Sequence, residues 1–380
     1  MLTKGFEVEV YTGSPNGDIV GLSDRITADI DGFVREPDSR NVEYVTDPLR
    51  DYEQLLCALV QPRLKLRQYL SSLGDYTIIP GSTLSLGDSS RFYRSEPNNP
   101  YHSYIEKTYG TQVVTASIHI NVGIPDPQLL LKACRLVRLE APLFLALSAA
   151  SPFLDGKVTG FHSNRWAVFP QTPKQVPLFE SHEHFIAWTE AQLTAGTMQN
   201  VRHLWSSVRP NGSARPYDLN RLELRICDLV THPVKLLAIC ALLEARIQQL
   251  IDDPSLDPFN SSIFYRDSAQ LERLTAANEQ AVARNSLDAE LSHWQDGRSL
   301  LARDWIEELY TEVWPTAKKH GFSCFLTPLQ TILRDGNEAQ QWLKTIDKGW
   351  SVRSVMQQAI LSMELDEMEL GNKLCEPMMA

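Results

Sequence analysis

Three short stretches of the sequence alternate apolar residues with residues that can bind metal ions or anions. They are Phe6-Glu7-Val8-Glu9-Val10-Tyr11, Ser117-Ile118-His119-Ile120-Asn121-Val122 and Arg221-Leu222-Glu223-Leu224-Arg225-Ile226. Successive side chains of a β-strand point to opposite faces, so each stretch would have one apolar face and one polar or charged face. If the three polar faces line one cavity, several carboxylates meet there, and like charges in a pocket need cations between them. Two or more Mg²⁺ ions would meet that need.

Each stretch also has an ordinary interpretation. Glu7 and Glu9 could lie on a solvated strand face, and His119 could belong to a hydrogen-bonded network on a sheet. Glu223 and Arg225 could form a cross-strand ion pair on an exposed sheet, which is the commonest fate of such residues. The joint occurrence of three strands with apolar backs and charged fronts favours a site for a metal ion or an anion. It does not identify a reaction.

Composition narrows the class of protein. The 380 residues carry a formal net charge of −11, and 43% of them are hydrophobic. This hydrophobic content is typical of a folded protein, and the acidic balance argues against a nucleic-acid or anionic-membrane partner, since both need a basic surface. No stretch reaches membrane-spanning length and no apolar signal core precedes the first strand, so we expect a cytoplasmic protein. The six cysteines show no zinc spacing, which favours reduced thiols.

Other stretches must complete the sheet and support it. Residues 41–46 are expected to form a strand that carries Glu43, and residues 76–79 another short strand. Residues 80–99 are rich in Gly, Ser, Pro and Asn, and so long a loop in a compact domain is more often functional than idle. Residues 18–35 show no pattern that assigns them. Apolar residues at helical spacing predict helices over about 50–73, 127–148, 181–194 and 231–252.

Two arginines are expected in irregular segments. The stretch 151–165 is expected to be a loop that ends with Arg165 and leads into a strand through Val168. Residues 204–208 are expected to form a strand, followed by a turn at Arg209-Pro210-Asn211-Gly212. Both arginines could be ordinary surface residues, which is the usual case.

The chain divides by pattern into two parts. Residues 253–262 contain two prolines and little periodicity, so we expect a core at 1–255 and a wholly helical region at 256–380 that packs on it. The tail after Met363 mixes acidic residues and methionines and is expected to fray. In the second part, helices are expected near 267–285, 298–319, 328–346 and 351–364.

Common nucleotide-binding motifs are missing. There is no GxGxxG, and the Gly156-Lys157 pair lacks the upstream glycine of a Walker A motif. A nucleotide would therefore have to be held through metal ions, as oxygen-rich Mg²⁺ sites allow.

An ordered set of motifs resembles one family. The set consists of Phe6-Glu7-Val8-Glu9, Val42-Glu43, Ser117-Ile118-His119-Ile120-Asn121, the Ser-Pro-Phe-x-x-Gly…Thr-Gly-Phe-x-Ser-x-Arg run at 151–165, Val208-Arg209-Pro210 and Leu222-Glu223-Leu224-Arg225. Its order is similar to that of glutamate–cysteine ligases and related carboxylate–amine ligases. The overall sequence resembles the cyanobacterial type most, over roughly residues 5–250.

The resemblance implies an α+β fold of the glutamine-synthetase-like kind. Its curved antiparallel sheet would have a charged concave face, with helices packed on the back and a helical C-terminal part. It also implies a reaction in which ATP phosphorylates the γ-carboxylate of L-glutamate and the amine of L-cysteine displaces phosphate. The product would be γ-glutamylcysteine, in the first step of glutathione synthesis.

The resemblance also implies roles for particular residues. Arg165 would pair with a substrate carboxylate, while Arg225 and Arg209 would face phosphates of ATP or the acyl phosphate as catalytic and substrate-binding groups. Such roles suit a guanidinium, whose planar fork matches carboxylate and phosphate. Carboxylate oxygens suit Mg²⁺, which neutralises charge during phosphoryl transfer. The implied metal-binding set is Glu7, Glu9, Glu43, His119 and Glu223.

Alternatives remain at this point. The same ligation chemistry with another amine acceptor is possible, because the motifs do not describe the acceptor pocket. A non-catalytic amino-acid or nucleotide sensor on this fold would be expected to lack some of the metal-binding acids, yet all the candidate ligands are present. The oligomeric state, the general base and any redox control are not indicated by the sequence.

Overall fold

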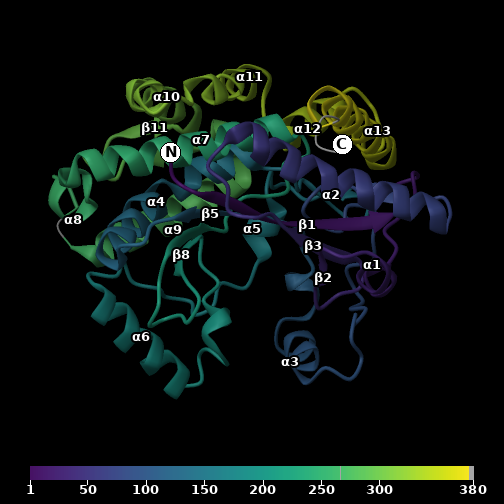
Figure 1. The fold of residues 1–380 in the computed structure, drawn as a ribbon, viewed down its shortest axis with the longest axis horizontal. Helices are drawn as coiled ribbons and strands as arrows, with labels where there is room; N and C mark the ends of the chain where they lie inside the picture. The colour runs from purple at the N-terminus through teal and green to yellow at the C-terminus, as the bar shows by residue number, and fades with distance from the viewer. Residues whose placement is uncertain (266, 376–380) are drawn as a thin grey trace.

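An antiparallel sheet of seven strands forms the centre of the computed structural model, which describes residues 1–265 and 267–375 (Figure 1). Strand β1 is the longest strand and pairs with β3, β4 and β5. In spatial order the strands are β2 (Phe33–Arg35), β3 (Asn41–Val45), β1 (Lys4–Gly13), β5 (Ile118–Gly123), β9 (Arg221–Leu224) and β8 (Val208–Asn211), with β4 (Thr77–Ile79) paired to the end of β1.

The alternation in the sequence becomes the two faces of this sheet. Phe6, Val8 and Val10 of β1 are fully buried, as are Ile118 and Ile120 of β5. Their neighbours in the sequence point to the opposite face, because side chains alternate along a strand. The predicted apolar back and polar front are therefore confirmed, and so is the α+β fold class with an antiparallel sheet and helices packed on it.

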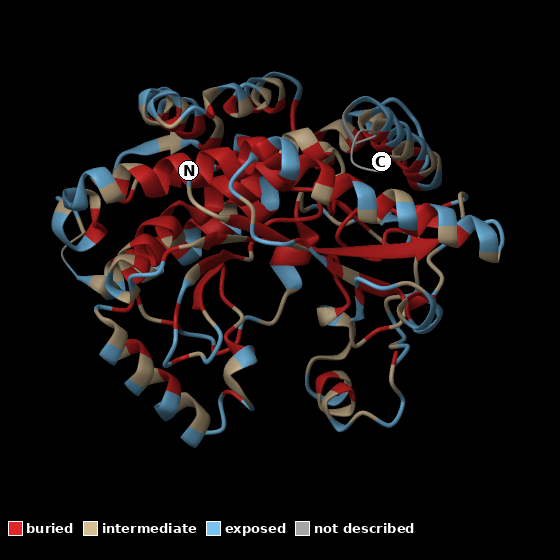
Figure 2. Cartoon of the chain, in the orientation of Figure 1, coloured by how far each residue is buried: buried red, intermediate tan, exposed pale blue. Residues whose placement is uncertain are grey.

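Three long helices cover the apolar face: α2 (Tyr52–Leu73), α4 (Pro127–Ser148) and α7 (Pro233–Asp252). The side chain of Asp126 accepts a hydrogen bond from the backbone of Gln128, so α4 begins with a capping residue followed by proline. Helices α4 and α7 are buried almost all round (Figure 2) because a second layer lies outside them. That layer contains α9 (Ser268–Asn285), α10 (Ala302–Lys319), α11 (Pro328–Asp335), α12 (Glu338–Asp347) and α13 (Val352–Leu370).

The opposite side of the sheet carries fewer helices. Helices α3 (Pro100–Tyr109) and α6 (His182–Thr194) lie there, below the sheet in Figure 1. Helix α3 was not predicted, and α6 was predicted correctly. Short elements complete the fold: α1 (Ser23–Asp29), α5 (Asn164–Val168), α8 (Pro258–Ser261) and the two-stranded sheet of β6 (Phe153–Leu154) and β7 (Lys157–Val158).

Two predictions around the arginines are wrong. Residues 164–168 form a helix and not a strand, because the side chain of Ser163 accepts a hydrogen bond from the backbone of Trp166 and caps it. Residues 209–211 belong to strand β8 and not to a turn. Pro210 is tolerated there because β8 lies at the edge of the sheet, where a missing backbone donor leaves no neighbouring strand unpaired.

The C-terminal part is not wholly helical. Strands β10 (Glu290–Ser292) and β11 (Ser299–Leu301) form a hairpin, so the helix expected from residue 298 begins at Ala302. The helix expected over 328–346 is broken at Gly336, whose φ is 95°, and Asn337 caps the next helix with a capping box. The expected fraying after Met363 is also wrong as far as Leu370, and residues 376–380 lie outside the described residues.

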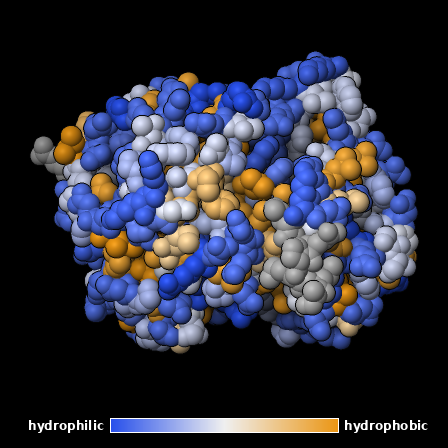
Figure 3. Space-filling view, turned by 45° about the horizontal axis from the view of Figure 1, so that its top comes forward, coloured by the Kyte–Doolittle hydropathy of each residue, from blue (hydrophilic) through white to orange (hydrophobic). Residues whose placement is uncertain are grey.

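Ion pairs join the two parts of the chain. Arg135 Nε donates to Asp257 Oδ1 at 3.0 Å, and Arg246 NH1 donates to Glu312 Oε1 at 2.8 Å. Whether 1–255 and 256–380 are separate folding units stays a prediction. The surface over the outer helices is mostly hydrophilic with scattered hydrophobic residues (Figure 3). Among the described helices, none combines the length and the apolar character that a membrane span requires.

Helix α13 is held by a buried carboxylate. Glu367 is fully buried, and its oxygens lie 3.3 Å from Arg63 NH1 and 2.5 Å from Arg67 Nε, both on α2. Glu364, one turn earlier, is 41% exposed and lies 4.0 Å from Arg67. The two acids therefore share a helix and a partner but differ in burial.

Replacing Glu367 by Gln should lower the free energy of unfolding by about 3–5 kcal/mol, because two buried guanidiniums lose their counter-charge. Glu364→Gln should change it by less than about 1 kcal/mol, since an exposed ion pair contributes little. Urea unfolding followed by circular dichroism measures both values. Equal effects of the two substitutions would contradict this account of how α13 is held.

Candidate active site

Strands β1 and β3 bring three carboxylates to the polar face of the sheet. Glu9 lies directly opposite Glu43 in the register of β1 and β3, and Glu7 lies opposite His119 in the register of β1 and β5. One ligand atom each from Glu7, Glu43 and His119 lie within 4.8 Å of one another. This is a spacing that a single cation could bridge.

Glu36 completes a second group and was missed from the sequence. It follows strand β2 directly, and one oxygen each from Glu9, Glu36 and Glu43 lie within 4.8 Å of one another. Glu43 belongs to both groups, so the two groups adjoin. The sequence around Glu36, from Phe33 to Pro37, did not indicate a site, because β2 is too short to show an alternation of apolar and polar residues.

Two of these carboxyl groups, Glu36 and Glu43, have raised pKa values. Burial, with the nearby charge of Glu9, raises the pKa of Glu36 to about 8. Burial and the charge of Glu36 raise the pKa of Glu43 well above its usual value. Both shifts come first from burial and then from the negative charge of the neighbouring carboxylates. Closely spaced carboxylate oxygens with an excess of negative potential fit hard divalent cations such as Mg²⁺.

A chain of hydrogen-bonded side chains links the two groups of potential metal ligands. His119 Nδ1 lies 2.9 Å from Glu7 Oε2, and His119 Nε2 lies 3.1 Å from Ser117 Oγ, which donates to Glu9 at 2.8 Å. Burial acts to raise the pKa of Glu7, but the hydrogen bond with His119 and nearby positive charge outweigh it, and the pKa is lowered. Glu7 is therefore held as a carboxylate.

Glu223 occupies a different environment. It is fully buried and accepts hydrogen bonds from Arg209 Nε at 2.7 Å, from Asn211 Nδ2 at 2.6 Å and from Arg225 NH1. Burial alone would raise the pKa of Glu223, but the two guanidiniums bring it well below its usual value. In this geometry Glu223 orients Arg209 and Arg225. Its predicted role as a metal ligand stays a prediction.

The carboxylates and several arginines line one cavity of about 700 Å³. Arg209 comes from β8 and Arg221 from β9, and Arg225 directly follows β9, while Arg202 and Arg215 lie in the segments on either side of β8. The cavity is therefore lined by both acidic and basic side chains. The residues are Glu7, Glu9, Glu36, Glu43 and His119 on the acidic wall, together with Arg202, Arg209, Arg215, Arg221 and Arg225.

Arg165 lines a neighbouring cavity of about 350 Å³. Its guanidinium donates to the carbonyls of Ile226 and Arg225 at 3.0 Å each, and its NH1 lies 3.7 Å from Asp228. Its buried Nε has no partner among the described residues. Glu9 and His119 also line this cavity, so it adjoins the acidic wall; its aromatic walls are Tyr101, Phe169 and Trp205.

Two serines of the 151–165 motif act on Arg165 through Asp228. Ser151 Oγ and Ser163 Oγ donate to the carboxylate of Asp228 at 2.7 and 2.9 Å. The backbone of Arg165 in turn donates to Ser151 Oγ at 3.1 Å. The two serines of the motif thus help to fix the position of Arg165 through buried hydrogen bonds.

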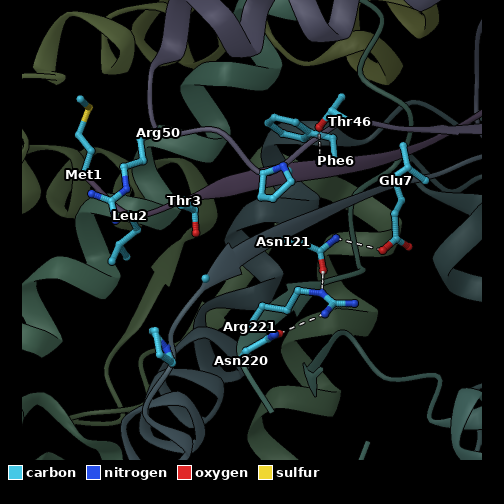
Figure 4. Close-up of a pocket in the computed structure, with 15 residues that line it drawn as sticks. Met1, Leu2, Thr3, Phe6, Glu7, Thr46, Arg50, Asn121, Asn220 and Arg221 are labelled. Carbon is cyan, nitrogen blue, oxygen red and sulfur yellow. Dashed lines mark hydrogen bonds between the residues drawn. The ribbon is translucent and has the colours of Figure 1, made fainter. Parts of the chain in front are cut away.

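A third cavity of about 550 Å³ lies at the start of β1 (Figure 4). Asn121 Nδ2 donates to Glu7 Oε1 at 3.1 Å, and Asn121 Oδ1 accepts from Arg221 Nε at 3.1 Å. Glu7 and Arg221 also line the central cavity, so these two residues stand between the two spaces. Much of the remaining wall is apolar and includes Leu2, Phe6 and Pro48.

The structure therefore gathers every predicted site residue around adjoining cavities. Glu7, Glu9, Glu43 and His119 share the acidic wall, and Arg165 faces the smaller cavity beside it. Glu223 lies behind Arg209 and Arg225. Sequence reasoning did not assign a site role to Glu36, Arg202, Arg215 or Arg221, and the first three lie in short or irregular segments.

Comparison with known proteins gives a family match. The model of "Glutamate-cysteine ligase family 2(GCS2)" matches residues 3–361. "Putative glutamate--cysteine ligase 2-1" of Rubrobacter xylanophilus is 27% identical over 292 residues, which cover 74% of each chain. "Putative glutamate--cysteine ligase 2" of Salinispora tropica is 25% identical, with 93% of each chain covered.

Two solved structures share the fold. A glutamate–cysteine ligase of Francisella tularensis in complex with AMP aligns with a TM-score of 0.74 at 12% identity, covering 97% of this chain and 91% of that one. A bifunctional glutathione synthetase of Pasteurella multocida aligns with a TM-score of 0.74 at 16% identity, covering 98% of this chain. The chain spans 53% of the length of that bifunctional enzyme.

If the two carboxylate groups hold Mg²⁺, its binding at pH 7 should release protons, because Glu36, with a pKa of about 8, must lose its proton to act as a ligand. Affinity for Mg²⁺ should rise with pH up to about 8. Without metal, the contribution of Glu36 to stability should fall as pH rises from about 4.5 to about 8, since its folded-state carboxyl holds a proton there that the unfolded state has lost. Calorimetry in two buffers of different ionisation enthalpy measures the released protons.

Glu36→Gln is the matched control for this titration. It keeps the shape of the side chain but carries no titrating group, so proton release should be smaller than in the original protein. Release that is unchanged in the variant, or absent in both proteins, would contradict the assignment of Glu36 to the cation-binding groups.

Proposed function

The chain belongs to glutamate–cysteine ligase family 2, and from this premise we propose that it is an ATP-dependent ligase that joins L-glutamate to L-cysteine. In the first step, an oxygen of the glutamate γ-carboxylate bonds to the γ-phosphorus of ATP and ADP leaves. In the second, the cysteine nitrogen bonds to the acyl carbon, phosphate leaves, and the nitrogen loses a proton. The product is γ-glutamylcysteine.

The observation that carries the proposal is that carboxylates and guanidiniums line the same central cavity. The negative oxygens of a polyphosphate can bind arginine directly. They can also bind divalent cations that carboxylates hold, so that the metal bridges phosphate and carboxylate. The cavity offers both guanidiniums and overlapping carboxylate groups. A nucleotide sensor could bind the same polyphosphate, so turnover is the property that separates it from a ligase.

The adjoining cavities suit the other parts of the substrates. The partly apolar cavity at the start of β1 would take the nucleoside, and Glu7 and Arg221 border it on the side of the phosphates. The cavity of Arg165 would take glutamate, with the unpartnered Nε of Arg165 available to a carboxylate. The AMP bound to the Francisella ligase supports a nucleotide site in this fold.

The resident cations would be held by two groups of side chains. Glu7, Glu43 and His119 form one, and Glu9, Glu36 and Glu43 form the other. When bound, Mg²⁺ neutralises charge on the transferring phosphoryl group and on its leaving group. The hydrogen bond between His119 and Glu7 orients the carboxylate before any ligand arrives.

Arg209 and Arg225 contribute preorganised positive charge. Both are hydrogen-bonded to the buried Glu223, so their guanidiniums need little rearrangement when negative charge develops beside them. Arg165 is fixed in the same manner by two backbone carbonyls. The side chains that meet the reacting groups are thus held in place by residues behind them.

With ATP, Mg²⁺ and L-glutamate, the purified protein should release ADP in a manner that depends on L-cysteine. Mass spectrometry should identify γ-glutamylcysteine as the product. Glutamate-dependent ADP release without that product would retain the ligase chemistry and point to another amine acceptor. No turnover by folded protein that binds Mg²⁺-ATP would favour the sensor.

Glu7→Gln should lower the rate of ADP release by on the order of 10²–10³, as the loss of a preorganised electrostatic group does. The fold should survive, because Glu7 lies on the cavity wall and not in the core. Steady-state ADP release and circular dichroism check the two statements. Glu290→Gln, an exposed acid on β10 outside the three cavities, should keep the original rate. Near-original turnover by Glu7→Gln at saturating Mg²⁺ would show that the metal assignment is wrong.

A further inference from the structure

The loop between β8 and β9 carries an arginine that the family motifs do not include. Residues 212–220 leave the edge strand, and Arg215 from this loop lines the central cavity together with Glu7 and Glu43. The guanidinium is anchored at one nitrogen, since its NH2 donates to the carbonyl of Val201 at 2.7 Å. The loop therefore places a positive group in the cavity that the carboxylates also line.

Two donors of Arg215 are left over. Its Nε and NH1 are buried and have no hydrogen-bond partner among the described residues. Buried donors without partners are uncommon, because each costs free energy that a partner would recover. The pattern points to a partner that comes from outside the chain.

Three of the neighbouring arginines already make hydrogen bonds within the chain. Arg209 donates to Glu223 and to the carbonyls of Arg202 and Leu204. Arg225 donates to Glu223. Arg221 donates to Asn121 and Asn220. Within the described arginine wall, Arg215 is thus distinguished by buried donors that remain for a ligand.

The surroundings of Arg215 are electropositive. Burial lowers the pKa of Arg215 to about 9, and the charges of Arg209, Arg225 and Arg221 act in the same direction, while Glu223 opposes them. The group remains protonated at neutral pH. A cluster of like charges around a buried cation is relieved when an anion lies between them.

We propose that Arg215 is a further substrate-binding residue, which holds oxygens of the nucleotide phosphates in the central cavity through Nε and NH1. The inference rests on the proposed function, because the anion is the polyphosphate of that reaction. A substrate carboxylate has similar chemistry, but Arg215 does not line the cavity of Arg165. It lines the cavity whose carboxylates would hold the cations, where phosphates are expected.

The direct test measures binding of tripolyphosphate with Mg²⁺ by calorimetry, without any amino acid. Arg215→Gln should weaken this binding by about tenfold to a hundredfold, as the loss of charge-assisted hydrogen bonds does. Arg215→Lys should recover only part of it, because lysine keeps the charge but not the planar fork. In steady state, Arg215→Gln should raise the KM for ATP and leave the KM for glutamate unchanged.

Tyr217→Phe is the matched control on the same loop. Its hydroxyl donates to Glu190 on the surface, 2.8 Å away, so removing it tests the loop without touching the cavity. This variant should bind tripolyphosphate as the original protein does.

Several results would overturn the proposal. They are original affinity in Arg215→Gln, a rise in the KM for glutamate alone, or no binding of tripolyphosphate by the original protein. If Arg215→Gln does not fold, Arg215→Lys decides, and unchanged affinity in it overturns the assignment. Absence of cysteine-dependent ADP release would refute the proposed function, whereas the tripolyphosphate measurement would still decide the role of Arg215.

Discussion

Repulsion between carboxylates on one face of the sheet is the constraint on which the rest of the site depends. Glu9, Glu36 and Glu43 have oxygens within 4.8 Å of one another, and Glu7 joins Glu43 through a second group. The raised pKa values of Glu36 and Glu43 express the cost of this arrangement. Under the proposed function, cations would occupy this cluster, and the arginines of the same cavity would bind an anion that those cations bridge.

The apolar back of the sheet holds these charges together. Strand β1 carries Glu7 and Glu9 on one face and Phe6, Val8 and Val10 on the other, so burying the apolar side chains fixes the direction of the acidic ones. Lys4, at the start of β1, is also buried and lies 2.8 Å from Glu244 of α7. Tyr52 of α2 donates to the same carboxylate at 2.8 Å. The strand is thus tied to two helices of the supporting layer.

Prediction from the sequence succeeded where a pattern repeats and failed where it is short. The alternation around Glu7, His119 and Glu223 was long enough to assign strands, faces and shared location. Glu36 was missed because β2 has only three residues, too few to show an alternation. Arg215 was missed because it lies in a loop, where side chains follow no repeating pattern. Pro210 suggested a turn where an edge strand tolerates it. Glu223 was expected beside a cation, but only the fold shows that Arg209 and Arg225 occupy its oxygens.

The most direct test of the central claim follows one oxygen atom. L-Glutamate labelled with ¹⁸O in its γ-carboxylate is incubated with the protein, ATP, Mg²⁺ and L-cysteine, and the phosphate released is analysed by mass spectrometry. Transfer of a phosphoryl group to the carboxylate predicts phosphate that carries one ¹⁸O, because the bond that breaks in the second step joins that oxygen to the acyl carbon. Unlabelled phosphate, released together with ADP, would show that ATP is cleaved without forming an acyl phosphate and would contradict the account.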